Sequence, residues 1–270
     1  MGLTQKILLF TSLLIVALVA ATVGFTSVQA DRLAHRTIHQ ALAETRDVWK
    51  TFEADRYNKL KLGVRVLAND PYFKAEVETR DEATVLASLN ERGADLKADF
   101  FVATDASGVV IARSDRPGGH GEDLAKDPLV AKALEGEEPS TVWKQGDRLF
   151  HAVALPMQTR GEIKGVLIAG YGLSEGLANQ IRRLTKSETA FLTLGTAGEP
   201  AISASSLASR EPALRGALQG STLGAHNGGP FELNLEGERF VAVEAPLETV
   251  AGAQVGLLVA LRSLSVEMTA

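Results

Sequence analysis

Two stretches of this sequence resemble each other, FFVATDASGVVIARSD at Phe100–Asp115 and FLTLGTAGEPAISASS at Phe191–Ser206. Each begins with an apolar segment and then reaches a glycine, Gly108 in the first copy and Gly198 in the second. In the first copy Asp, Ser and Gly surround that position, and they supply the local hydrogen bonds and the positive φ that a tight turn requires. Each stretch therefore predicts two strands joined by a hairpin.

The similarity continues beyond these hairpins, because three more landmarks follow in the same order in both copies. They are a short helical segment, a hairpin strand and a last strand: Leu129–Gly136, Gly146–Pro156 and Gly165–Gly170 in the first copy; Pro212–Gly220, Gly237–Pro246 and Gly256–Leu261 in the second. The offset between copies stays near ninety residues throughout. Self-similarity of this kind indicates two tandem copies of one supersecondary unit.

Each copy predicts a five-stranded sheet. In the first copy the expected strands are Phe100–Thr104, Val109–Ser114, Ser140–Gln145, Arg148–Leu155 and Ile163–Tyr171. Short loops join most of them, which favours an antiparallel sheet with its helices on one face, an α+β fold. A curved sheet of five strands has a concave side that can hold a small ligand.

The N-terminus contains 22 residues without a charge, Ile7–Val28, which at about 1.5 Å per residue span a hydrocarbon core of roughly 30 Å. Lys6 supplies a positive flank, so we expect a transmembrane helix that anchors the chain. The alternative is a cleaved signal peptide, since Val28-Gln29-Ala30 resembles a cleavage site. The apolar run is longer than a usual signal peptide core, and either interpretation delivers the remainder outside the cytoplasm.

A long helix is predicted from about Asp31 to Asn69, where Asp70-Pro71 ends it because the residue before proline avoids the α region. Mostly apolar or bulky residues recur every three or four positions and form a seam along one side of this helix. They are Ile38, Leu42, Thr45, Trp49, Phe52, Arg56, Leu60, Gly63 and Leu67. A second helix is expected at Glu82–Leu96. The seam can pack against the chain's own sheets or form a homodimer interface, and both can hold on different faces.

Composition excludes several classes of function. The 270 residues carry a formal net charge of −5, which argues against nucleic acid as a partner because phosphate binding needs clustered Lys and Arg. The absence of cysteine excludes disulfides, thiolate zinc sites and iron–sulfur clusters. His35 and His39 lie four residues apart, but no third ligand accompanies them, so no metal and no cofactor are expected.

A membrane helix, a long following helix and two tandem PAS-like modules together resemble a double Cache sensory domain of a bacterial membrane receptor. The segments that carry the resemblance are Phe100–Asp115, Ala152–Met157, Gly165–Leu177, Ala242–Leu247 and Gly256–Leu264. The resemblance implies an anchor or signal peptide at 1–30, helices at 31–99, a membrane-distal module at 100–180 and a membrane-proximal module at 181–270. The Tyr, Arg, Trp, Tyr and Asp pattern of the amino-acid-binding branch cannot be placed on this chain, so amino-acid sensing is not implied.

The resemblance further implies that the first module holds a small-molecule ligand and that a cytoplasmic output domain lies beyond this chain. It implies residence in the inner membrane, with residues 31–270 periplasmic or extracellular. The alternative is a membrane-anchored periplasmic binding or interaction protein that acts through a partner.

Ligand contacts are expected where the first copy has polar or aromatic residues that the second lacks. His151 aligns with Val241, and Tyr171 falls near Arg262. Strand alternation places His151 on one face, where we expect it to meet Trp143 and Tyr171 around a cavity. Arg113 or Arg148 would bind a carboxylate there. The competing interpretation is that the aromatic residues are core and the arginines are solvated.

Gly172-Leu173-Ser174-Glu175-Gly176 matches the nucleophile elbow of hydrolases. Ser265 recurs at the equivalent place of the second copy without the flanking glycines. Because a helix N-cap explains both serines, we expect Ser174 to be a cap, and no catalytic residue is predicted.

Overall fold

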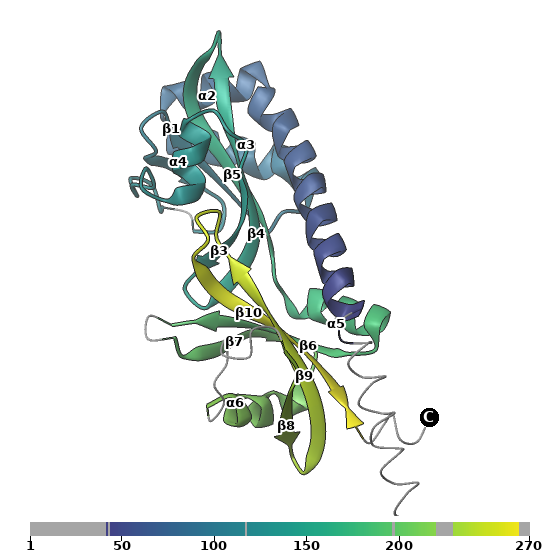
Figure 1. Cartoon of the computed structure of the whole chain (residues 1–270). Helices are drawn as coiled ribbons and strands as arrows, with labels where there is room; N and C mark the ends of the chain where they lie inside the picture. Colours follow the sequence, from purple (N-terminus) through teal and green to yellow (C-terminus); the bar gives the residue numbers. More distant parts are fainter. Residues whose placement is uncertain (1–41, 43, 117, 196–197, 220–228, 265–270) are drawn as a thin grey trace, which may run out of the picture.

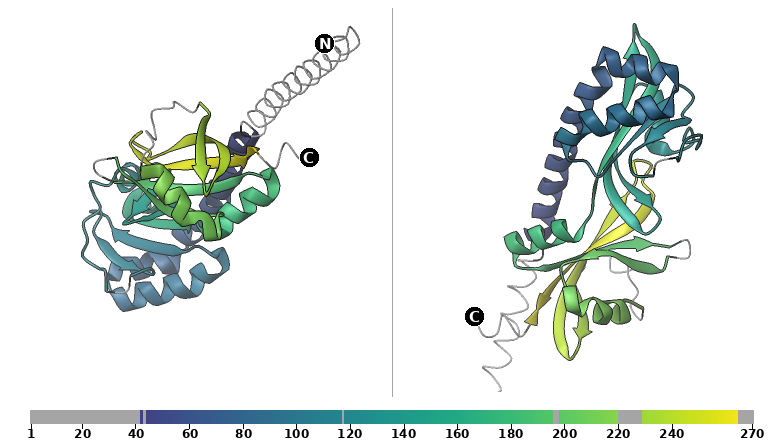
Figure 2. Two further views of the ribbon diagram at one scale, coloured as in Figure 1. Left: turned by 90° about the horizontal axis from the view of Figure 1, so that it is seen from below. Right: turned by 180° about the vertical axis from the view of Figure 1, so that it is seen from behind.

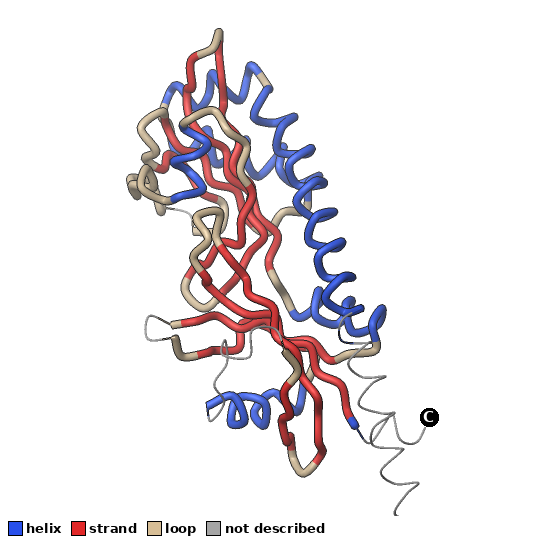
Figure 3. Tube along the Cα trace, in the orientation of Figure 1, coloured by secondary structure: helices blue, strands red, loops and turns tan. Residues whose placement is uncertain are grey.

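The computed structural model describes residues 42, 44–116, 118–195, 198–219 and 229–264. A long helix at residues 44–69 leads into α2 (Pro71–Thr79), α3 (Glu82–Gly93) and a 3₁₀ turn at Ala94–Leu96. The first sheet then forms, followed by α5 (Glu175–Thr185) and the second sheet (Figure 1). The two sheets lie one after the other along the molecule, with the long helix beside them (Figure 3).

Both sheets are antiparallel, with five strands each. The first contains β1 (Phe100–Asp105), β2 (Val110–Arg113), β3 (Ser140–Gln145), β4 (Arg148–Thr159) and β5 (Glu162–Gly172). The second contains β6 (Glu188–Leu194), β7 (Pro200–Ser205), β8 (Phe231–Leu235), β9 (Glu238–Glu248) and β10 (Gln254–Ser263). Their orders, β2-β1-β5-β4-β3 and β7-β6-β10-β9-β8, are the same, so the predicted tandem fold is confirmed.

Strand pairing repeats in detail. His151 pairs with Tyr171 in the first sheet, as Val241 pairs with Arg262 in the second, which confirms the alignment of these residues. The β1–β2 and β6–β7 pairs each contain a register shift at the same place. The two copies therefore share their irregularities as well as their strand order.

Steric crowding explains why glycine stands at two matched positions of the repeat. A Cβ at Gly165 would collide with the carbonyl oxygen of Thr104, and a Cβ at Gly256 with that of Leu192. In both sheets the last strand approaches the neighbouring backbone closely, and only glycine fits such a contact.

Helices cover both faces of the first sheet. The long helix, α2 and α3 pack on one face, where Leu60, Phe73 and Leu89 are fully buried. On the other face lies α4 (Pro128–Leu134), and its Leu129 contacts Phe100 and neighbouring strand residues. We call these the long-helix face and the α4 face; the right-hand view of Figure 2 presents the former.

The second sheet is covered in the same manner. On one face lie a 3₁₀ turn (Ala208–Arg210) and α6 (Glu211–Gln219), with Leu214 buried in the core. The opposite face meets the long helix, since Trp49 packs with Phe191 and Leu258.

Asp70 and Pro71 end the long helix as predicted, but they also begin α2, which was not predicted. The Asp70 side chain accepts hydrogen bonds from the backbone nitrogens of Tyr72 at 2.8 Å and Phe73 at 3.3 Å. Pro71 occupies the first turn, where its missing N–H has no partner to lose. The predicted helix Glu82–Leu96 is present as α3 and the 3₁₀ turn that follows.

The seam of the long helix packs against the chain's own sheets, as the first interpretation holds. Leu42, Thr45, Trp49, Leu60 and Leu67 are buried. The predicted anchor, Ile7–Val28, lies outside the described residues. Within the part of the chain that is described, no helix combines the length and the apolar character that crossing a bilayer demands.

Candidate functional site

The five residues predicted to contact a ligand fall on two faces of the first sheet. Trp143 pairs with Phe150, whereas His151 pairs with Val142 and Tyr171. Because neighbouring residues of a strand point to opposite faces, Trp143 lies on the α4 face and His151 on the long-helix face. The expected meeting of His151 with Trp143 around one cavity does not occur.

Trp143 packs against Phe100 in the core of the α4 face, and the two ring centroids are 5.3 Å apart. Its Nε1 donates a hydrogen bond of 3.0 Å to Asp127 Oδ2. The other oxygen of Asp127 accepts from the backbone N–H of Leu129 at 2.9 Å and so caps α4. The indole therefore links the sheet to the start of the helix that covers it.

Arg113 lies at the end of β2 with its side chain only 5% exposed. Its Nε and Nη2 donate to the two oxygens of Asp115 at 2.9 Å, and its Nη1 donates to Glu122 at 2.6 Å. The hydrogen bond to Asp115 raises the pKa of Arg113, so the buried guanidinium stays charged. When the side-chain amide of Gln145 is oriented to satisfy both Arg113 and Asp115, its oxygen accepts a hydrogen bond from Arg113 Nη2 at 3.0 Å.

Arg148 is exposed, and its guanidinium carbon lies 4.9 Å from the ring centroid of Phe150. Phe150 belongs to the α4-face core, so Arg148 lies at this face. Arg113 pairs with Val102 of the same core, so Arg113, Trp143 and Arg148 share the α4 face. A carboxylate that displaced Asp115 or Glu122 would find a charged, oriented guanidinium there. We call these three residues and their acidic partners the Arg113 site.

His151 lies on the long-helix face with no exposed surface. Its Nδ1 accepts a hydrogen bond from Arg56 Nε at 3.2 Å. Its Nε2 lies 3.4 Å from Glu53 Oε1 but makes no hydrogen bond of good geometry with the described residues. The ring is 5.2 Å from that of Trp49 and 4.7 Å from that of Tyr57. Burial lowers the pKa of His151, so the imidazole is kept neutral.

Tyr171 lies beside His151 and holds the same helix. Its hydroxyl donates to the carbonyl of Leu96 at 2.8 Å, and Arg56 lies over its ring at 5.0 Å from the centroid. Arg56 Nη2 also donates to the carbonyl of Gly172 at 3.0 Å. His151 and Tyr171 thus fasten the long helix to β4 and β5.

The partners of His151 on the long helix, Glu53, Arg56 and Tyr57, were not predicted as site residues. One signal for the arrangement was present in the sequence. Gly146 and Asp147 form a two-residue hairpin loop, and such a loop fixes the register of its strands. That register places Trp143 opposite Phe150 and therefore away from His151.

Ser174 caps α5, as predicted. Its Oγ accepts from the backbone N–H of Leu177 at 3.4 Å. Its counterpart Ser265 lies outside the described residues.

Comparison with known protein families identifies the family of this chain. The model of one family, described as the double sensory domain of two-component sensor kinases, matches residues 35–268. The chain belongs to this family. The resemblance to a double Cache sensory domain is thereby confirmed, and the family is a sensory one. No curated protein matches the chain significantly.

Solved sensor domains share the double Cache fold at low sequence identity. The periplasmic domain of Vibrio cholerae LuxQ is 12% identical with a TM-score of 0.51, over 82% of this chain and 99% of that one. The V. cholerae histidine kinase DctB sensor domain is 14% identical with a TM-score of 0.54, over 87% and 98%. The Campylobacter jejuni chemoreceptor Tlp3 sensory domain, solved with isoleucine bound, is 14% identical with a TM-score of 0.51, over 91% and 98%.

Proposed function

We propose that this chain is the extracytoplasmic sensing region of a transmembrane receptor and that it binds a small molecule at the Arg113 site of the first module. The observation that carries the proposal is the buried, charged guanidinium of Arg113, which two carboxylates hold between the sheet and the loop before α4. A ligand that binds one of two conformations better than the other shifts the balance between them. A ligand carboxylate that competes with Asp115 and Glu122 would change how this loop is held.

The signal would pass from the sheet to the long helix through His151 and Tyr171. Arg56 binds both the imidazole of His151 and the carbonyl of Gly172, so a movement of β4 or β5 is transmitted to the helix. In this role His151 and Tyr171 support the Arg113 site without contacting the ligand.

The proposed orientation places the first module farther from the membrane. Leu42, near the predicted anchor, packs with Val241, Ala260 and Leu264 of the second module. Both described ends of the chain thus lie together at the second module, which we propose is the membrane-proximal one. An output domain beyond Ala270 completes the proposal, and the alternative is an anchored binding protein that acts through a partner.

A small-molecule screen by thermal unfolding of the full chain tests the proposal. A ligand should raise the melting temperature, and Arg148→Gln should reduce that shift because Arg148 is exposed beside the site. The matched control is Arg183→Gln, since Arg183 is exposed on α5 of the second module. A shift equally reduced in both variants would discard the Arg113 site.

We further propose a homodimer through the long helix. Leu62 and Val66 are 61% and 76% exposed, and they lie one helical turn apart on its outer side. Val66→Asp should shift the protein toward monomer in sedimentation velocity. A monomeric wild-type chain, or a dimer untouched by the aspartate, would contradict this proposal.

A further inference from the structure

A cavity of about 580 Å³ lies in the second module, where β6 and β9 begin and β7 and β10 end. This size falls within the range of small-molecule pockets, roughly 300–1,000 Å³. Leu207, Phe240 and Leu261 give it a buried apolar wall. The cavity is separate from the Arg113 site, which belongs to the first sheet.

Basic side chains predominate around this cavity. The lining includes four of them against two carboxylates: Arg182, Lys186, Arg210 and Arg262, with Glu188 and Glu238. Its formal charge is therefore +2, although the whole chain carries −5. A concave surface of one sign focuses its field and attracts ligands of the opposite sign.

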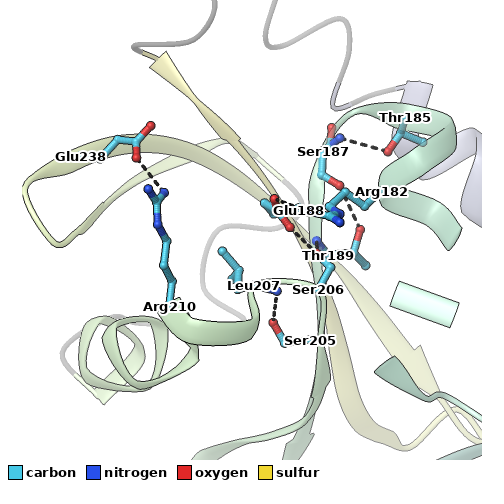
Figure 4. A network of polar contacts seen from close by, with 10 residues as sticks. All are labelled: Arg182, Thr185, Ser187, Glu188, Thr189, Ser205, Ser206, Leu207, Arg210 and Glu238. Atoms are coloured by element: carbon cyan, nitrogen blue, oxygen red, sulfur yellow. Dashed lines mark hydrogen bonds and ion pairs between the residues drawn. The ribbon is translucent and has the colours of Figure 1, made fainter. Parts of the chain in front are cut away.

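The two carboxylates hold two of the arginines in place (Figure 4). Arg182 on α5 lies 3.4 Å from Glu188, and Arg210 before α6 lies 2.7 Å from Glu238. Ser206 Oγ donates to Glu188 at 2.5 Å, and Ser263 Oγ donates to Glu238. Each glutamate thus has a second donor that would hold it if its arginine turned toward a ligand.

The cavity occupies the place in the second module that the Arg113 site occupies in the first. Ser206 Oγ accepts from the backbone N–H of Thr189 at 2.9 Å, as Ser114 Oγ accepts from Phe101 at 2.9 Å. The two sites differ in access. Arg113 is 5% exposed, whereas the side chains of Arg182 and Arg210 are 45% and 43% exposed. A ligand could therefore reach the guanidinium groups of the second module directly.

We propose that this cavity is a second ligand-binding site, which takes a small organic dianion such as a dicarboxylate. Two negative charges match the formal charge of the lining, and the planar fork of arginine binds a carboxylate through two parallel hydrogen bonds. Arg182 and Arg210 each receive one carboxylate. The apolar wall that includes Phe240 accommodates the hydrocarbon segment between them. This site lies outside the proposed function, which places its ligand in the first module.

Isothermal titration calorimetry tests the site with the full chain at low ionic strength and the straight-chain dicarboxylates from malonate to adipate. One or more of them should bind saturably and more tightly than acetate. Arg182→Gln and Arg210→Gln should each weaken binding about tenfold, equivalent to about 1.4 kcal/mol, because each removes a charge-assisted hydrogen bond to the ligand. The corresponding lysine variants keep the charge but lose the fork, and they should bind with intermediate affinity.

Two controls distinguish this site from general electrostatic attraction and from binding in the first module. Arg183→Gln removes the same charge from the next position of α5, outside the cavity, and should leave the affinity unchanged. Arg160→Gln removes an exposed charge from the turn between β4 and β5 of the first module, outside the Arg113 site, and should also leave the affinity unchanged. Absence of saturable binding, or equal weakening by Arg183→Gln, would overturn the proposal. Loss of binding in Arg148→Gln alone would also overturn it, and would instead support the Arg113 site.

Discussion

His151 lies beneath the long helix, and its ring is held by Arg56 through Nδ1. Protonation would place a hydrogen on that same nitrogen, facing the Arg56 N–H, so the cation would lose its hydrogen bond and meet a like charge. Glu53 opposes this effect, because its carboxylate favours a charged imidazole. Burial is the largest influence on the pKa of His151 and lowers it.

Stability should therefore fall on mild acidification. A histidine whose folded pKa is lowered binds more protons when unfolded, so its contribution is complete above the unfolded pKa of about 6.5 and declines as the pH falls below that value. Chemical denaturation at a series of pH values should give a free energy of unfolding that decreases below about pH 6.5. His151→Gln should flatten this dependence. A slope unchanged in His151→Gln would contradict the assignment.

Gly165 and Gly256 lie where the last strand of each sheet crosses a neighbouring carbonyl. Gly165→Ala and Gly256→Ala should each destabilise the protein by about 1–3 kcal/mol, because the backbone must move to admit a methyl group. Gly216→Ala is the matched control: its Cβ meets nothing within 4 Å, and alanine favours a helix, so it should stabilise slightly. Urea unfolding compares the three, and a neutral Gly165→Ala would disprove this steric cause.

At the scale of elements, α2 begins at the residues that end the long helix. Asp70 serves both elements, because its carboxylate caps α2 and also pairs with Arg92 of α3 at 2.5 Å. One side chain therefore fixes the corner at which three helices meet.

Asp70→Ala should cost about 1 kcal/mol or slightly more, the usual effect of removing an N-cap together with a half-exposed ion pair. Asp95→Ala, at an exposed position in the 3₁₀ turn, is the control and should cost little. Thermal unfolding compares the two variants. If the two melt alike, the cap has no special role.

The sequence predicts the helices and strands well, but it predicts less well which face of a sheet each side chain occupies. Strands and long helices follow from local periodicity, so β3 is found at its predicted bounds, Ser140–Gln145. The start of α2 was missed because Pro71 can end one helix and begin another, and local pattern alone does not distinguish the two. The Arg113 site also depends on the loop residues Asp115 and Glu122, whose approach to the arginine results from tertiary structure. No periodicity encodes that contact.

At the scale of the whole molecule, Trp49 joins the two modules. Its ring lies 5.2 Å from His151 of the first sheet and 5.4 Å from Phe191 of the second. The same core includes Leu149 and Leu258, one from each sheet. The modules are therefore expected to unfold together.

Trp49→Ala should destabilise the protein by about 3–5 kcal/mol and weaken this coupling. Differential scanning calorimetry should show one transition for the wild type and two for the variant, because the modules would then unfold separately. Tyr72→Ala, at a position 77% exposed, should keep the single transition. A single transition in Trp49→Ala would show that other contacts suffice to couple the modules.

The long helix packs against the first sheet at one end and against the second sheet at the other. Leu60 and Leu67 are embedded in the core of the first sheet, while Leu42, at the opposite end, is embedded against the second. Residues 44–69 extend about 39 Å, so a tilt of about 5° at the upper end displaces the lower end by about 3 Å. A rearrangement too small to alter the first sheet visibly would thus become a displacement large enough to repack side chains beside β10.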